Sequence, residues 1–152
     1  MPVVLPFEAI EWSDDMATGV ATIDRQHRFL VDTLCDANRR LLASRENALP
    51  GQIVRDLLAY AVLHFVTEEE LTKRVGYDLA CSAVAGAHVA QHREFSRRLV
   101  AVCDGLREGR DVSRLDVLEY LNDWLRNHVL GIDRHLGAFV RDRTGRVHPF
   151  ES

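Results

Sequence analysis

Residues 58–78 read LAYAVLHFVTEEELTKRVGYD, and their apolar positions repeat with the period of an α-helix. The apolar stripe begins just before this stretch, at Ile53 and Leu57, and it includes His64 and Glu68. These two polar residues are four apart, so they lie one turn apart on the same helix face. A buried imidazole or carboxylate without a partner costs free energy. The stretch therefore predicts a helix whose inward face carries polar groups for a functional reason.

Three other stretches repeat this pattern. His88 and His92 are four residues apart in AHVAQHREF, and His128 and Asp133 fall in WLRNHVLGIDRHL. His27 lies on the apolar side of a further helical pattern. A single inward histidine is more often an ordinary core residue than a ligand. Five histidines and two carboxylates that converge from four helices favour a metal centre, because a metal ion compensates all of them together.

The pattern predicts an all-α protein that forms an up-down-up-down antiparallel four-helix bundle. The four helices are predicted over residues 23–43, 52–75, 87–107 and 114–141. An N-terminal arm of residues 1–20 would precede a bundle of residues 21–143, and residues 144–152 would form a polar tail. Residues 76–87, GYDLACSAVAGA, are predicted to be a loop with a short helical turn inside it.

Composition and charge exclude several classes of protein. The chain has 152 residues and a net charge of −4 without a basic block, which argues against nucleic-acid binding. No apolar run is long enough to span a membrane, and the N-terminal MPVVLPFEAIEW lacks the positive region of a signal peptide. The three cysteines form no C-x-x-C pair, so free thiols and a cytoplasmic location are expected.

The donor set constrains the metal. Seven candidate ligands are too many for one tetrahedral zinc ion, and no cysteine is among them. Imidazole combined with carboxylate suits iron, manganese or zinc, so donor chemistry leaves the metal's identity open. The number of ligands indicates two metal ions, with the carboxylates able to bridge them.

Several of these stretches together resemble the hemerythrins, and in particular the single-domain bacteriohemerythrins. The resemblance rests on Trp12, on GVATIDRQH at 19–27, on HFVTEE at 64–69, on HVAQH at 88–92 and on WLRNHVLGID at 124–133. It covers nearly the whole chain, and the combination is far more specific than any one of these motifs. One departure is visible, because the chain is longer than the family pattern by roughly one helical turn between Glu68 and His88.

The resemblance implies a centre of two non-haem iron ions, with an oxo or hydroxo bridge between them and O₂ as the ligand. Seven residues would hold the irons: His88, His92 and His128 on the first, His27 and His64 on the second, and Glu68 and Asp133 as bridges. The second iron would have one ligand fewer, so O₂ would bind there. Leu125 matches the leucine of the family's O₂ pocket and would keep that pocket dry.

Two functions remain open on this basis. The first is reversible O₂ binding as a carrier, store or sensor, without enzymatic activity, and with an O₂-consuming or signalling protein as a possible partner. The second is a di-iron enzyme, such as an oxidase, a peroxidase or a nitric-oxide-handling protein. The histidine-rich donor set favours reversible binding, since fewer anionic ligands stabilise high-valent iron less well. No additional inward acid or tyrosine stands out in the sequence as a relay for protons or radicals.

The last helix presents a geometric conflict. His128 and Asp133 are five residues apart, which on a regular helix leaves them about 140° apart in direction. His135, seven residues after His128, would point almost the same way as His128. The resemblance nevertheless implies Asp133 as the ligand. We therefore predict local unwinding of the π type between His128 and Asp133, at Gly131, which would turn Asp133 inward and His135 away.

Overall fold

The computed structural model describes residues 7–43 and 51–144, and the other residues fall outside this description. All regular structure in the described ranges is helical, as the sequence predicts. The elements are η1 (Asp14–Met16), α1 (Ala21–Ala43), α2 (Gly51–Val75), α3 (Tyr77–Ala80), α4 (Ser82–Arg107), α5 (Arg114–Leu130) and α6 (Ile132–Thr144). The predicted polar tail, apart from Thr144, lies outside the described residues. None of the helices in the described ranges is both long and apolar enough to cross a membrane.

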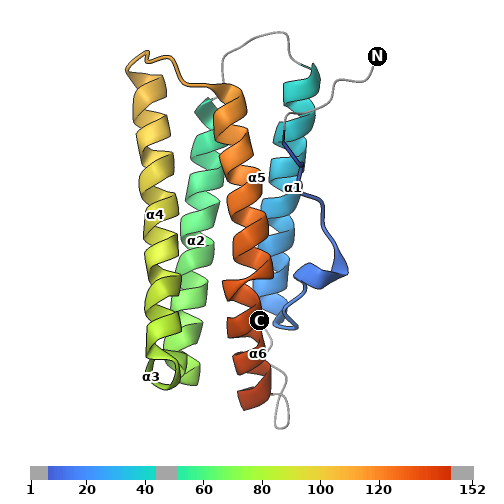
Figure 1. The fold of residues 1–152 in the computed structure, drawn as a ribbon, viewed down its shortest axis with the longest axis vertical. Helices are drawn as coiled ribbons and strands as arrows, with labels where there is room; N and C mark the ends of the chain where they lie inside the picture. The colour runs from blue at the N-terminus through green and yellow to red at the C-terminus, as the bar shows by residue number, and fades with distance from the viewer. Residues whose placement is uncertain (1–6, 44–50, 145–152) are drawn as a thin grey trace.

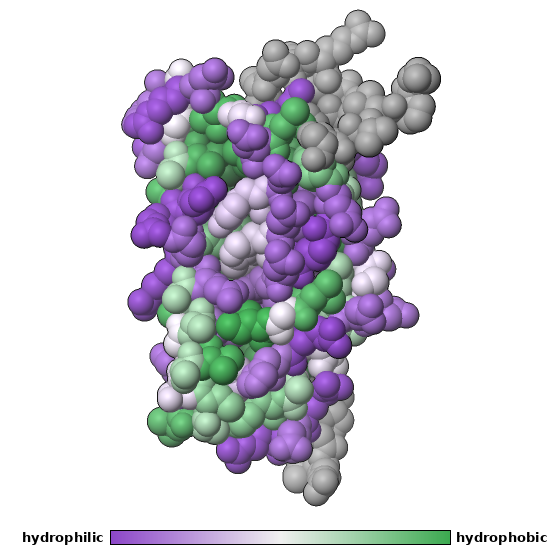
Figure 2. Space-filling model, in the orientation of Figure 1, coloured by the Kyte–Doolittle hydropathy of each residue, from purple (hydrophilic) through white to green (hydrophobic). Residues whose placement is uncertain are grey.

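The long helices lie side by side along the long axis of the molecule (Figure 1). Helix α2 packs against both α1 and α4, and α1 also packs against α5. Helix α6 continues the direction of α5, so α5 and α6 together occupy the place of one long helix (Figure 1). This arrangement is consistent with a four-helix bundle. Polar side chains cover much of the face drawn in Figure 2, with apolar patches between them.

The segment between the second and third long helices is mostly helical. The prediction of a loop over residues 76–87 is therefore wrong for most of these residues. Helix α3 supplies the short helical turn that was expected, but α4 begins at Ser82, five residues before its predicted start. The segment is rich in alanine, which is the best helix former. Gly76 separates α2 from α3 with a φ of 77°, a left-handed conformation that glycine adopts readily. The additional length is therefore absorbed as helix.

Residues 7–20, which the sequence predicts to be part of an arm, pack closely on the bundle. Ile10 and Met16 are buried in the main apolar cluster. The backbone N–H of Ile10 donates a hydrogen bond of 2.8 Å to Oδ1 of Asn122 in α5. Asn122 also exchanges hydrogen bonds with Asn38 of α1, at 2.9 and 3.1 Å. These buried amides tie the N-terminal segment, α1 and α5 together.

Two apolar clusters divide the core along the bundle. One contains Leu30, Phe65, Phe95 and Val129, and the other contains Ile23, Leu71, Ala85 and Leu136. Helices α1, α2 and α4 contribute to both clusters, whereas α5 contributes to the first and α6 to the second. On each helical unit, the polar residues of the predicted centre lie in the sequence between a member of one cluster and a member of the other, or directly beside one of them. The fold therefore encloses a polar layer between two apolar ones.

The conflict in the last helix is resolved by a break at Gly131. Helix α5 ends at Leu130 and α6 begins at Ile132, so the single helix predicted over 114–141 is wrong. The N–H of Gly131 still bonds to the carbonyl of Asn127 at 2.9 Å, and no π-helical residue occurs in the described ranges. The predicted irregularity is therefore present, but as a kink rather than a π turn. As expected, Asp133 turns inward and is fully buried.

The kink requires glycine for a steric reason. A Cβ atom at Gly131 would lie 2.7 Å from the carbonyl oxygen of Asn127, which is closer than such atoms approach in proteins. This oxygen belongs to the backbone and cannot move without distorting α5.

We predict that Gly131→Ala lowers the free energy of unfolding by about 1–3 kcal/mol and moves Asp133, because the backbone must shift to relieve the clash. Gly86→Ala is the control, since Gly86 lies in α4 with nothing within 4 Å of an added Cβ. This control should raise stability by about 0.5–1 kcal/mol through helix propensity. Urea unfolding of both variants measures the difference. Equal effects of the two substitutions would contradict the steric account.

Candidate metal centre

The seven residues singled out in the sequence meet inside the bundle. All of them are at most 3% exposed. They come from every long helix: His27 from α1, His64 and Glu68 from α2, His88 and His92 from α4, His128 from α5, and Asp133 from α6. The i, i+4 spacings in α2 and α4 place each pair on one inward face, as the sequence predicts.

The seven residues form two overlapping groups that share Glu68 and Asp133. One group adds His88, His92 and His128, and the other adds His27 and His64. Within each group the ligand atoms lie within 4.8 Å of one another. Both groups are large enough to hold a metal ion.

The two carboxylates lie between the histidine groups. Oδ2 of Asp133 is 2.7 Å from Nε2 of His27, whereas its Oδ1 is 2.7 Å from Nε2 of His88. Oε1 of Glu68 lies 3.1 Å from Nε2 of His64 and 3.2 Å from Nε2 of His92. Each carboxylate thus contacts one histidine from either group, which is the placement that a bridging ligand needs.

The inward atoms lack satisfactory hydrogen bonds. The Nε2 atoms of all five histidines and both oxygens of Glu68 and Asp133 are buried without a hydrogen-bond partner, although they lie close together. Buried polar atoms are normally paired, and leaving this many unpaired in one place would be costly. A cation that accepts their lone pairs would satisfy all of them. The donor set therefore fits a metal centre by its own geometry.

A second layer of side chains orients three of the imidazoles. In each case the outward Nδ1 atom lies at hydrogen-bond distance from a side-chain oxygen, and the acceptor comes from a helix already in the site. The pairs are His64 with Gln26 at 2.6 Å, His92 with Glu69 at 2.9 Å, and His128 with Gln91 at 2.8 Å. An oxygen acceptor keeps the proton on Nδ1 and leaves the Nε2 lone pair directed at the centre.

Sequence reasoning did not identify these orienting residues. Gln26 and Glu69 each adjoin a predicted ligand in the chain, and Gln91 precedes His92. This adjacency is the only signal that could have found them. It is weak, because it does not tell which histidine each one contacts.

Aromatic rings fix two of the imidazole planes. The ring of Phe65 stacks on His92 with centroids 4.0 Å apart, and Trp124 stacks on His128 at 4.4 Å. Both interplanar angles are small, at 11° and 12°. The two aromatic side chains thus cover the His92 and His128 rings from the apolar side of the site.

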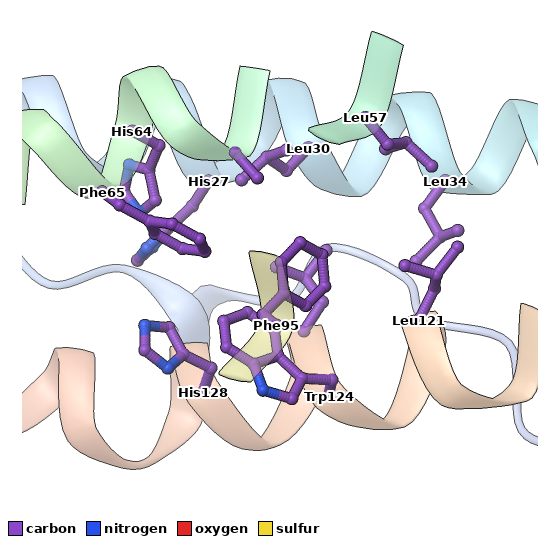
Figure 3. Close-up of a pocket in the computed structure, with 12 residues that line it drawn as sticks. His27, Leu30, Leu34, Leu57, His64, Phe65, Phe95, Leu121, Trp124 and His128 are labelled. Carbon is purple, nitrogen blue, oxygen red and sulfur yellow. The ribbon is translucent and has the colours of Figure 1, made fainter. Parts of the chain in front are cut away.

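An apolar cavity of about 20 Å³ adjoins the centre. A space of this size holds about one very small molecule. Figure 3 shows His27 and His64 at one end of the cavity, with Leu30, Leu34 and Leu57 along the α1 and α2 side. Leu125 lines it as well and is 7% exposed. His128, from the three-histidine group, also lines the cavity, so the cavity borders both histidine groups.

Charge in the site shifts the pKa values of its groups. Burial alone would lower the pKa of His64, but the charge of Glu68 and the nearby Asp133 raise it to about 9. Burial opposes protonation of His88 too, yet the close carboxylates of Asp133 and Glu68 raise its pKa to about 10. Burial would raise the pKa values of Glu68 and Asp133, and the surrounding histidines nevertheless hold them well below their usual range. The carboxylates are thus ready to act as anionic ligands.

His135 points away from the centre, as predicted. Its Nδ1 atom lies 2.6 Å from the hydroxyl of Tyr77, the first residue of α3. Tyr77 is fully buried, and burial, with the charges of Cys81 and Asp133, raises its pKa to about 12. No inward tyrosine was expected from the sequence, and the buried Tyr77 corrects that expectation. The residue was missed because it lies in the segment predicted to be a loop.

Comparison with known proteins agrees with this geometry. The family model described as the hemerythrin HHE cation binding domain matches residues 18–140. Bacteriohemerythrin of Stenotrophomonas maltophilia (strain R551-3) is 30% identical over 141 residues, which cover 86% of each chain. The chain belongs to the hemerythrin family.

Other members give the same picture of this hemerythrin-family chain. Bacteriohemerythrin of Pseudomonas paraeruginosa (strain DSM 24068 / PA7) is 31% identical over 88% of each chain. The crystal structure of a wild-type hemerythrin superposes with a TM-score of 0.73 at 24% identity, covering 88% of this chain and 98% of that one. This structural likeness supports the hemerythrin fold.

We predict that metal uptake by this hemerythrin-family protein releases protons. His64 and His88 are protonated at pH 7 in the metal-free protein, because their pKa values are about 9 and about 10, and a metal ion requires neutral Nε2 atoms. Apparent metal affinity should therefore rise with pH until about pH 10. Calorimetric titration with Fe²⁺ in buffers of different ionisation enthalpy measures the protons released. Heats that are independent of the buffer would contradict the prediction.

The raised pKa values of His64 and His88 contribute to the pH dependence of the metal-free fold. The two histidines have pKa values above the ordinary 6.5, so their contribution to stability is complete below about pH 6.5 and is lost as the pH rises through 9 to 10.

Proposed function

We propose that the protein binds O₂ reversibly at a pair of non-haem iron ions. The observation that carries this proposal is the convergence of five histidines and two shared carboxylates beside a small apolar cavity. Membership of the hemerythrin family supports iron over manganese and zinc, a choice that donor chemistry alone leaves open.

In this proposal each histidine group holds one iron ion. His88, His92 and His128 bind the first, and His27 and His64 bind the second. Glu68 and Asp133 would supply donors to both ions, and an oxo or hydroxo group would complete the centre. The proposal is supported by the close approach of each carboxylate to both histidine groups. It also assigns the four long helical units to an up-down-up-down topology, which agrees with the course of the ribbon in Figure 1.

The iron pair would bind O₂ and supply the electrons that hold it. The role of the chain is to position the donors and to keep water out. Gln26, Glu69 and Gln91 hold three imidazoles in the tautomer that leaves Nε2 free. The cavity next to His27 and His64 is also lined by His128, and its other lining residues are aliphatic or aromatic, Leu125 among them. A dry pocket favours a bound apolar gas over water and slows protonation of the bound ligand.

The protein would act as a carrier, store or sensor of O₂ in the cytoplasm, with an O₂-consuming or signalling protein as the recipient. The alternative is a di-iron enzyme that uses the same centre. One observation favours this alternative, namely the partly buried hydrogen bond between Tyr77 and His135, which lies two residues beyond Asp133. The donor set argues against it, because five neutral imidazoles stabilise high-valent iron less well than anionic ligands do.

We expect the reduced, iron-loaded protein to gain a visible absorption band on addition of O₂ and to lose it when O₂ is removed under argon. Repeated cycles with little loss of amplitude support reversible binding. The control is the zinc-loaded protein, which should show no band. Irreversible bleaching with consumption of a reducing substrate would contradict the proposal and support the enzyme instead.

We expect Leu125→Ala to retain both irons, because no donor is lost, but to shorten the lifetime of the O₂-bound form. Leu125 is buried in the cavity wall, so the smaller side chain admits water near His128 and His64. The space left by the removed side chain should also lower the free energy of unfolding by about 2–5 kcal/mol. The decay of the O₂-dependent absorption in parent and variant measures the lifetime. An unchanged decay rate would mean that Leu125 only packs the core.

A further inference from the structure

The cavity beside His27 and His64 is separated from solvent by a wall that is one side chain thick between α1 and α2. Leu30 of α1 and Leu57 of α2 line the cavity on its inner side. The same two leucines also line a groove on the surface of the protein. Each is 4% exposed. No other layer of side chains therefore separates the groove from the cavity at this point.

The outer groove is wide and largely apolar. Its volume is about 450 Å³, and its other lining residues include Phe29, Tyr60 and Leu63. Phe29 and Leu63 are 51% and 54% exposed, which is unusual for large apolar side chains. The rings of Phe29 and Tyr60 stack across the α1–α2 seam with centroids 4.1 Å apart. The groove thus offers an apolar surface directly outside the two leucines.

The other sides of the cavity are closed more firmly. Phe95 and Trp124 pack with centroids 4.2 Å apart, and Phe65 contacts both rings edge to face. Each of these rings thus packs against the other two. A second groove, between α2 and α4, is lined by residues such as Thr72, Lys73 and Ala85 and shares no lining residue with the cavity.

We propose that small apolar gases enter and leave the metal cavity between α1 and α2, through a gate formed by Leu30 and Leu57. This inference rests on the proposed function, since it assigns the path that O₂ takes to the site. Figure 3 shows the two leucines on the side of the cavity that α1 and α2 form. Leucine side chains change rotamer on a fast timescale, so rotation of either one opens the wall briefly.

A gate has a defined kinetic signature. It changes the barrier between solvent and cavity, but it leaves the energies of the free and bound states the same. Substitution of a gate residue should therefore change the association and dissociation rates of O₂ by similar factors and change the dissociation constant little. A residue that contacts bound O₂ would mainly alter the dissociation rate.

The first experiment measures O₂ association and dissociation by stopped flow with the reduced, iron-loaded protein. Leu57→Ala should raise both rates about tenfold, a barrier change of about 1.4 kcal/mol, whereas Leu57→Phe should lower both. Leu30→Phe is the matching variant on the facing helix. Leu118→Ala is the control, because Leu118 is 2% exposed and lines neither the cavity nor the groove. Rates that stay unchanged in the gate variants, or change equally in the control, overturn the proposal.

The second experiment does not depend on O₂ chemistry. Crystals of the iron-loaded parent and of Leu57→Phe are pressurised with krypton for a short, equal time, since dry apolar cavities bind noble gases. We expect krypton in the cavity and groove of the parent, and in the groove alone of the variant. Equal occupancy of the cavity in both crystals overturns the gate. A parent that takes up krypton but does not bind O₂ refutes the proposed function while leaving the passage intact.

Discussion

The burial of seven polar side chains in one layer of the bundle is the constraint on which the rest of the structure depends. Their inward atoms have no hydrogen-bond partners, so the layer is costly unless cations compensate it. Apolar clusters lie on both sides of the layer and keep water away. With cations bound, the residues that would weaken an ordinary core would instead connect the long helices, because each of these helices supplies a donor.

Several irregular features of the fold make sense as consequences of this constraint. Gly131 breaks the last helix so that Asp133 reaches the layer. The side chain that a regular helix would have placed there, His135, is instead paired with Tyr77. The oxygens of Gln26, Glu69 and Gln91 lie at hydrogen-bond distance from the Nδ1 atoms of His64, His92 and His128. The break at Gly131 and the three acceptor oxygens thus set the direction in which Asp133 and three histidine side chains point.

The helices and the polar residues of the centre could be predicted from the sequence because both depend on local spacing. His64 and Glu68, like His88 and His92, share a face whenever the chain is helical, whatever the tertiary packing. An irregularity was predicted because a regular helix could not place both His128 and Asp133 inward. Its form, in which a Cβ added at Gly131 would lie 2.7 Å from the carbonyl oxygen of Asn127, does not follow from residue spacing. The role of residues as ligands to iron stays a proposal.

Features that depend on contacts between distant segments could not be predicted. Tyr77 and His135 are 58 residues apart, and Ile10 and Asn122 are 112 residues apart. The segment around Cys81 was predicted to be a loop with a short helical turn, but it is rich in alanine and packs as helix against α2. In the sequence, the gate residues Leu30 and Leu57 likewise look like any other leucine of an apolar helix stripe. Only the structure reveals that the same two side chains line a cavity and a surface groove.

Anomalous diffraction at the iron absorption edge, from crystals of the iron-loaded protein, tests the central claim most directly. The account predicts two anomalous peaks per chain, one against His27 and His64 and the other against His88, His92 and His128, with Glu68 and Asp133 contacting both. A single peak, or a second peak outside this layer, would contradict the account.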